Sequence, residues 1–294
     1  MDTTGTAVAI VETAGRAMTA QAQNDGHLIE LWVGSSNSDH TRRARVEDAR
    51  RFLAFVGKPL TMVTVGDLIG FIDGLAGSDS TKARKVKHAK SLLTFGHRIG
   101  FLAFNVGGVV KAPAVKETLA ERIVTEADVH RMLALETDPR NRVLLTLLYA
   151  AGLRISETVG LVWRDCAPRD DAGQINVYGK GGKTRVVLLP ASTWRAMAAL
   201  RADAPADAPV FESRKGGALD PSAVHRVVKA AAERAGLDPA VSAHWLRHAH
   251  ASHSLDRGAP IHLVQATLGH ASVATTGRYL HARPNDSSGR YLGM

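Results

Sequence analysis

Apolar residues recur every three or four positions along most of the chain, and short breaks rich in glycine, proline and asparagine separate these segments. This spacing predicts amphipathic helices, each of which buries one face. In the first third of the chain it predicts four helices, over residues 26–32, 39–55, 65–75 and 81–97. The breaks contain the residue types that turn a chain at low cost. We therefore expect a small helical bundle in this region.

The helical pattern ends where Gly107, Gly108 and Pro113 interrupt it, so we interpret this stretch as a linker. A second domain should follow, because helical periodicity resumes over 126–135, behind Thr125 as N-cap, and over 140–149. The predicted organisation is a tail over 1–22, a helical domain over 23–106, a linker over 107–119 and a second domain over 120–294.

The second domain contains the chain's one clear strand signal. Residues 174–178 alternate apolar and polar side chains, 184–189 are rich in β-branched residues, and a glycine- and lysine-rich segment joins them. This pattern predicts a β-hairpin whose tip carries Lys180 and Lys183. Helices are expected again over 191–201, 221–235, 243–256, 260–268 and 273–280. The predicted fold class is mainly α with a small β-sheet.

Composition excludes several classes of protein. The 294 residues include one cysteine, Cys166, so a disulfide scaffold and a cysteine-rich zinc cluster are excluded and a reducing compartment, the cytoplasm, is expected. The longest apolar run, over 143–151, is far shorter than the ~20 residues of a membrane span. The first residues lack the basic cluster that opens a secretory signal. We expect neither membrane insertion nor secretion.

Positive charge is concentrated in one part of the chain. The formal net charge is +9, and no acidic residue occurs between Ser80 and Lys116. A solvated helix face usually mixes both signs, whereas like charges repel unless a polyanion screens them. We therefore expect the helix over 81–97 to pack its apolar face and to contact nucleic acid with outward-facing cations. These cations are Lys82, Arg84, Lys85, Lys87 and Lys90.

Several polar side chains in the second domain are candidates for chemistry, although each has an ordinary structural alternative. Arg154 lies three residues before Glu157. The two side chains could form an ordinary surface ion pair, or Glu157 could orient Arg154 toward a phosphate. The hairpin lysines also suit a solvated turn. His244 and Arg247 share one helix face, and Tyr279 follows His270 nine residues later.

A zinc site on the same helix is not expected. His244 and His248 stand four residues apart, as in metalloprotease helices, but Trp245 occupies the position of the glutamate that such helices carry. Arg247 would also repel a divalent cation. No metal site is predicted.

The order of these elements, Gly-Leu-Arg, a lysine hairpin, His-x-x-Arg-His, Leu-Gly-His and then tyrosine, resembles the tyrosine recombinases of the phage integrase and Xer type. The resemblance covers nearly the whole chain after the first two dozen residues. It implies an N-terminal helical core-binding domain of the SAM-like kind and a C-terminal mixed α/β catalytic domain, which together form a C-shaped clamp on double-stranded DNA. By motif match the catalytic set is Arg154, Lys180, His244, Arg247, His270 and Tyr279, with Glu157 in support. Lys183 then joins the DNA-binding cations.

These residue types suit phosphoryl transfer. The arginines and histidines would stabilise charge on the phosphate oxygens, and Tyr279 would attack phosphorus with His244 as a proton acceptor. Lys180 would protonate the leaving 5′-oxygen. The resemblance implies a 3′-phosphotyrosyl intermediate, a Holliday junction and four protomers on two DNA sites, without metal, cofactor or ATP. It leaves open the need for accessory proteins and the docking of the C-terminal tail.

Two other functions remain open from the sequence. One is DNA relaxation by a type IB topoisomerase, which uses a related tyrosine, arginine, lysine and histidine set. The other is a DNA-binding regulator or architectural protein that lacks the chemistry. Covalent attachment to a suicide DNA substrate and the formation of recombinant products distinguish the three.

Overall fold

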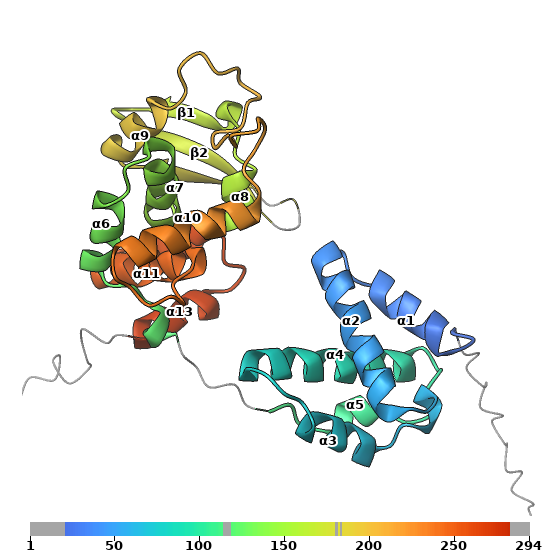
Figure 1. The fold of residues 1–294 in the computed structure, drawn as a ribbon. Coiled ribbons are helices and arrows are strands. Elements are labelled where there is room, and N and C mark those ends of the chain that lie inside the picture. The colour runs from blue at the N-terminus through green and yellow to red at the C-terminus, as the bar shows by residue number, and fades with distance from the viewer. Residues whose placement is uncertain (1–20, 114–118, 180–181, 183, 283–294) are drawn as a thin grey trace, which may run out of the picture. The chain divides into compact units, whose positions relative to one another are not determined.

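The computed structural model describes residues 21–113, 119–179, 182 and 184–282. The chain divides into two compact units, Met1–Glu117 and Thr118–Met294. Helices dominate both, and a small antiparallel sheet lies in the second (Figure 1), so the predicted fold class is confirmed. No helix in the described part of the chain is long and apolar enough to cross a bilayer. The C-shaped clamp stays a prediction.

The four helices predicted for the first unit are confirmed. Their apolar faces meet in one core that includes Leu28, Trp32, Phe52 and Leu92. The helical elements of this unit are α1 (Asp25–Gly34), α2 (Asp39–Val56), the 3-10 turn η1 (Leu60–Met62), α3 (Val65–Asp73), α4 (Asp79–Arg98) and α5 (Val106–Val109).

The short helix α5 lies at the start of the segment predicted to be a linker. The side chain of Asn105 caps it by accepting a hydrogen bond of 2.9 Å from the backbone N–H of Gly108. Gly107 packs against α4 so closely that a Cβ there would lie 2.3 Å from the carbonyl oxygen of Lys90. The glycines from which the linker is predicted thus include one, Gly107, that permits close packing against α4.

The second unit combines a three-stranded sheet with a larger set of helices. The strands are β1 (Cys166–Arg169), β2 (Ala172–Tyr178) and β3 (Thr184–Leu189), all antiparallel in the order β1-β2-β3. The helical elements are η2 (Ala120–Arg122), α6 (Glu126–Ala134), α7 (Pro139–Ala150), α8 (Ile155–Val159), η3 (Trp163–Asp165), α9 (Ala191–Ala198), α10 (Pro221–Arg234), α11 (Ala243–Asp256), α12 (Ile261–Leu268) and α13 (Val273–Ala282). The predicted hairpin is β2 and β3, which pair from Gly173 with Leu189 to Tyr178 with Thr184.

Strand β1 and helix α8 were not predicted. β1 is a four-residue edge strand that contains Pro168, and an edge is one of the few places in a sheet where proline is tolerated. α8 has five residues, too few to show a helical period. The N-cap that the sequence predicts, Thr125, is confirmed, because its side chain accepts from the backbone N–H of Asp128. Asp220 caps α10 in the same way by accepting from the backbone N–H of Ala223.

The helices of the second unit surround α11 at one end and cover the sheet at the other (Figure 1). Helix α9 packs on β2 through Trp194, whose ring atoms lie where a Cβ on Gly173 would have to stand. Helix α11 contacts α7, α12 and α13, and its buried residues include Leu246, Arg247 and Ala249. A buried arginine on the central helix needs partners, and these partners build the candidate site.

Candidate active site

Three arginine side chains from different elements meet at the last turn of α12. Arg185 of β3 donates to the carbonyl oxygen of Thr267 at 2.7 Å. Arg247 of α11 donates to the Leu268 carbonyl at 2.5 Å, and Arg154 to the Gly269 carbonyl at 3.5 Å. The last carbonyls of a helix lack partners within the helix and carry partial negative charge. The end of α12 therefore stabilises three guanidinium groups side by side.

A single carboxylate, Glu157 of α8, orients two of these arginines. Its oxygens accept two hydrogen bonds of 2.9 Å from Arg185, and 2.8 Å bonds from the backbone N–H and guanidinium of Arg154. Burial of the carboxyl raises its pKa, but the hydrogen bonds and positive charge from Arg185 and Arg154 outweigh this and lower the pKa to about 2. Glu157 is thus ionised, and the three arginines keep an excess of positive charge.

Gly152 makes the turn that brings α7 and α8 to α12. Its φ of +57° lies in the left-handed region, and a Cβ would lie 2.6 Å from Cδ2 of Leu268. Its carbonyl oxygen accepts a hydrogen bond from Arg247, which is 2% exposed. Burial, followed by the positive charge of Arg154, lowers the pKa of Arg247 to about 10, so the group stays protonated at neutral pH.

The hydroxyl of Tyr279 on α13 is buried against α11, the helix that also carries Arg247. Tyr279 is 5% exposed, and its hydroxyl lies 2.6 Å from Nδ1 of His248. The His270 ring is parallel to the phenol at a centroid distance of 6.5 Å, and the His244 ring lies 4.2 Å from that of His248. The sequence predicts His244 as the proton acceptor. In the structure, the phenol pairs instead with His248, which lies one helical turn after His244 on α11.

The histidines around the phenol are neutral at physiological pH. Burial first, and then nearby arginines, lower the pKa of His270 to about 4 and also lower that of His244. Burial first, and then electrostatic interactions with His244 and Arg122, lower the pKa of His248 to about 3. Nδ1 of His270 lies 2.9 Å from the Thr276 hydroxyl, which fixes the ring. Burial raises the pKa of Tyr279, so the free protein holds it as a phenol.

A cavity of about 590 Å³ opens beside the arginines. Its lining includes Arg154, Arg185 and His270, together with Gly179 and Thr184 at the two ends of the hairpin tip. The Arg154 side chain is 40% exposed, so a ligand in the cavity can reach it. The hairpin lysines Lys180 and Lys183 lie outside the described residues.

The basic residues predicted to bind DNA differ in exposure. Lys85 is 9% exposed, so it does not lie on the outer face expected for it, because helical spacing places it on one face with the buried Ala89 and Leu92. Arg84 pairs with the buried carboxylate of Asp48, and Lys90 donates to the carbonyl of Val110. Lys82 is half-buried and Lys87 exposed.

Two residues of the site, Arg185 and His248, were not among the predicted catalytic residues. An arginine inside an otherwise apolar β-branched strand was the signal available for Arg185. His248 ends the His-x-x-Arg-His motif, but the only role that the sequence suggests for it is that of a zinc ligand, which is rejected. Within the described ranges, no group of three or more histidine, cysteine, aspartate or glutamate side chains could hold a metal ion.

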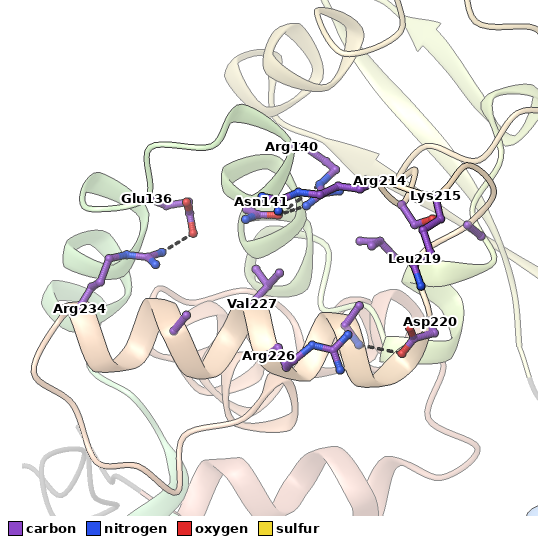
Figure 2. A pocket seen from close by; sticks show the side chains of 14 residues that line it. Glu136, Arg140, Asn141, Arg214, Lys215, Leu219, Asp220, Arg226, Val227 and Arg234 are labelled. Atoms are coloured by element: carbon purple, nitrogen blue, oxygen red, sulfur yellow. Dashed lines mark hydrogen bonds and ion pairs between the residues drawn. The ribbon is translucent and has the colours of Figure 1, made fainter.

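A second cavity, of about 550 Å³, lies along α10 (Figure 2). Arg234 pairs there with Glu136, while Arg140 donates to the side-chain oxygen of Asn141. Its cationic lining residues are Arg140, Arg214, Lys215, Arg226 and Arg234, against the acidic Glu136 and Asp220. None of the described residues predicted to be catalytic lines it.

Comparison with known proteins, by sequence and by structure, finds integrases and recombinases in both cases. Residues 121–286 match the model of the phage integrase family. The chain is 33% identical over 268 residues to the tyrosine recombinase XerC of Brucella suis biovar 1 (strain 1330), covering 82% of this chain and 84% of that protein. Its fold is similar to that of the XerH site-specific recombinase bound to difH in a pre-cleavage complex, with a TM-score of 0.69 and 22% identity; the match covers 92% of this chain and 84% of that one. The fold is also similar to that of a lambda integrase tetramer bound to a Holliday junction, with a TM-score of 0.71 and 16% identity; this match covers 91% of this chain and 80% of that one.

Proposed function

The chain belongs to the phage integrase family as an Xer-like tyrosine recombinase, and from this premise we propose that it cleaves and rejoins DNA strands with Tyr279 as the nucleophile. The observation that carries the assignment of the site is the meeting of Arg154, Arg185 and Arg247 at the end of α12 beside an open cavity. Such a cluster of positive charge is complementary to the negative charge of a phosphodiester.

In this proposal the phosphate lies against the guanidinium groups of Arg154 and Arg247. Their planar forks donate to the non-bridging oxygens, whose charge grows as the transition state forms. Arg185 and Glu157 hold Arg154 in place through the shared carboxylate. His244 and His270, both with lowered pKa values, contribute neutral hydrogen bonds rather than further charge.

The covalent step exchanges one phosphate ester for another. Tyr279 Oη forms a bond to phosphorus while the bond from phosphorus to the 5′-oxygen breaks. The phenolic proton passes from Oη to a neutral histidine beside it, and the 5′-oxygen takes a proton from Lys180, which we propose as the general acid. Because the 3′-phosphotyrosyl bond conserves the ester, a 5′-hydroxyl of another strand can reverse the attack without ATP.

Recombination follows when the 5′-hydroxyl that attacks the 3′-phosphotyrosyl bond comes from the other DNA site. We propose a homotetramer on two DNA sites and a Holliday-junction intermediate, supported by the similarity to the tetrameric lambda integrase complex and by identity to XerC. The same similarities favour recombination over topoisomerase-like relaxation and over a silent DNA-binding role. Relaxation of supercoils without recombinant products on any DNA would reverse that preference.

The decisive experiment measures covalent attachment of the protein to a nicked suicide DNA substrate. The substrate is selected from a random duplex library by recovering the DNA that becomes trapped on the protein. We expect Tyr279→Phe to bind the selected DNA and to form no adduct. Tyr149→Phe is the matched control, since Tyr149 also pairs its hydroxyl with a histidine of α11. An adduct formed by Tyr279→Phe would refute the assignment.

A further inference from the structure

We infer that His248 is a further catalytic residue of this reaction, in which its Nδ1 accepts the hydroxyl proton of Tyr279 as the bond from Oη to phosphorus forms. The inference rests on the proposed function, because it needs Tyr279 to be the nucleophile. The proton moves from Oη to Nδ1, the ring becomes an imidazolium, and the 5′-oxygen is protonated separately by Lys180. Rejoining returns the proton from His248 to the phenol.

The geometry singles out His248 among the neighbours of Tyr279. The distance of 2.6 Å between its Nδ1 and the hydroxyl is that of a short hydrogen bond, and both side chains are buried. Nδ1 of His270 already pairs with the Thr276 hydroxyl. The arginines of the site only donate hydrogen bonds, so they cannot accept a proton.

The positive charges around His248 keep its ring neutral in the free protein, but they also oppose its protonation. Burial and nearby positive charge lower its pKa to about 3, so one ring nitrogen has a free lone pair. A DNA phosphate would add negative charge among these cations, which counters their repulsion and makes the imidazolium less costly. The groups that face His248 are His244 and Arg247 on its own helix, Arg122 from η2, and Arg278 and Tyr279 from α13.

A second tyrosine–histidine pair on the same helix serves as an internal comparison. Nδ1 of His253 lies 3.0 Å from the hydroxyl of Tyr149, with ring centroids 5.8 Å apart. Glu126 lies 3.9 Å from that histidine. The same histidine-to-asparagine change in this pair alters a similar hydrogen bond without touching Tyr279, so His253→Asn is the matched control.

The test separates proton acceptance from positioning by comparing His248→Asn and His248→Ala. The amide oxygen of asparagine can replace Nδ1 as a hydrogen-bond acceptor but cannot take a proton, whereas alanine does neither. We measure single-turnover adduct formation on the suicide substrate from about pH 6 to 8.5, where wild-type His248 stays neutral. Both variants should be slowed by about 100-fold or more near neutral pH. Their rates should rise by about tenfold per pH unit relative to wild type, because they depend on phenolate formed by solvent.

Acidifying the nucleophile gives an independent readout. Replacing the tyrosines by difluorotyrosine lowers the phenol pKa, which should restore much of the rate of His248→Asn while changing wild type and His253→Asn little. DNA binding and thermal unfolding of each variant show whether it is folded. A pH-independent loss without rescue, or a rate for His248→Asn equal to wild type, would overturn the inference. If Tyr279→Phe still forms the adduct, the proposed function fails instead.

Discussion

Glu157 is the side chain on which the charge balance of the site depends. Its carboxylate is 3% exposed and pairs with Arg185 and Arg154, and its pKa falls from 4.5 to about 2. A lowered carboxyl pKa adds stability that is present above the unfolded value and is lost as the pH falls through the folded value. We expect Glu157→Gln to lower the free energy of unfolding by roughly 3 kcal/mol at neutral pH.

Urea unfolding at several pH values checks this prediction. The difference between wild type and Glu157→Gln should narrow as the pH falls from 4.5 toward 2. Asp207→Asn is the control, because Asp207 pairs with Arg164 on the surface, where it is 77% exposed. Its effect should stay below about 1 kcal/mol. A difference for Glu157→Gln that does not change with pH would contradict the assignment.

Arg154 differs from Glu157 in that we expect its loss to affect chemistry more than folding. It is 40% exposed and lines the cavity, so Arg154→Ala removes a donor to the phosphate and leaves Glu157 paired with Arg185. Loss of one such donor costs ~3 to 4 kcal/mol of transition-state stabilisation, which corresponds to a rate loss of about 100- to 1,000-fold. Single-turnover adduct formation at saturating DNA measures it.

Arg131→Ala is a suitable comparison for Arg154→Ala. Arg131 also forms an ion pair three residues apart, with Asp128, and is 48% exposed, but it lies on α6 outside the cavity lining. We expect its adduct formation to match that of wild type. Near-normal cleavage by Arg154→Ala would remove Arg154 from the catalytic set.

Among the elements, the turn between α7 and α8 sets the position of two arginines. Gly152→Ala meets two costs: the left-handed φ of +57° and a Cβ only 2.6 Å from Leu268. The backbone conformation costs about 1 to 2 kcal/mol and the overpacking about 1 to 3 kcal/mol. We expect a loss of unfolding free energy of about 2 to 5 kcal/mol and slower cleavage, because the Gly152 carbonyl anchors Arg247.

The backbone cost can be measured alone at Gly236, after α10. Its φ is +64°, and no heavy atom lies within 4 Å of the position that a Cβ would occupy. Gly236→Ala should therefore lose only about 1 to 2 kcal/mol and cleave DNA normally. Chemical denaturation and adduct formation of both variants test the pair. Equal losses at the two sites would show that the contact with Leu268 does not constrain the turn.

The same elements show how far the sequence predicts the fold. Long periodic helices such as α2 and α10 were predicted to within a few residues, because their apolar faces repeat over several turns. Helix α8 is too short to show such a repeat, and the proline in β1 argues against a strand. Neither element could therefore be predicted from the sequence pattern alone.

For the site, motif order selected residues that the structure does bring together, including Arg154, Arg247 and Tyr279. Arg185 lies outside the motifs and His248 ends the His-x-x-Arg-His motif, but motif order assigns a catalytic role to neither, because their importance lies in three-dimensional pairing. Arg185 meets Glu157 across 28 positions, and His248 meets Tyr279 across 31. No periodicity or local spacing in the sequence records such contacts.

At the scale of the whole molecule, the two units carry different kinds of positive charge. The arginines of the second unit converge on carbonyls and one carboxylate, which fixes them for chemistry. In the first unit, a cavity of about 610 Å³ beside α4 is lined by Arg45, Lys87, Lys90 and Arg98 among others. Cations of this second kind suit contacts along a DNA backbone, which contribute affinity without taking part in cleavage.

This division predicts that binding and cleavage can be separated by mutation. Each phosphate contact contributes about 0.9 to the slope of the logarithm of the binding constant against the logarithm of salt concentration. We expect the double variant Lys82→Ala, Lys87→Ala to weaken binding and to flatten this slope by up to about two units. Its adduct formation at saturating DNA should equal that of wild type. Titrations at several salt concentrations give the slope.

Arg84 on the same helix provides the contrast that makes the test specific. Its guanidinium is paired with the buried carboxylate of Asp48, so Arg84→Ala should lower stability more than it changes the salt slope. Lys82 and Lys87 belong to no ion pair within the described residues, and their loss should act mainly through DNA. If the lysine double variant leaves the slope unchanged while Arg84→Ala flattens it, DNA contacts the Asp48 side of α4, and the predicted DNA-binding face of the first unit is wrong.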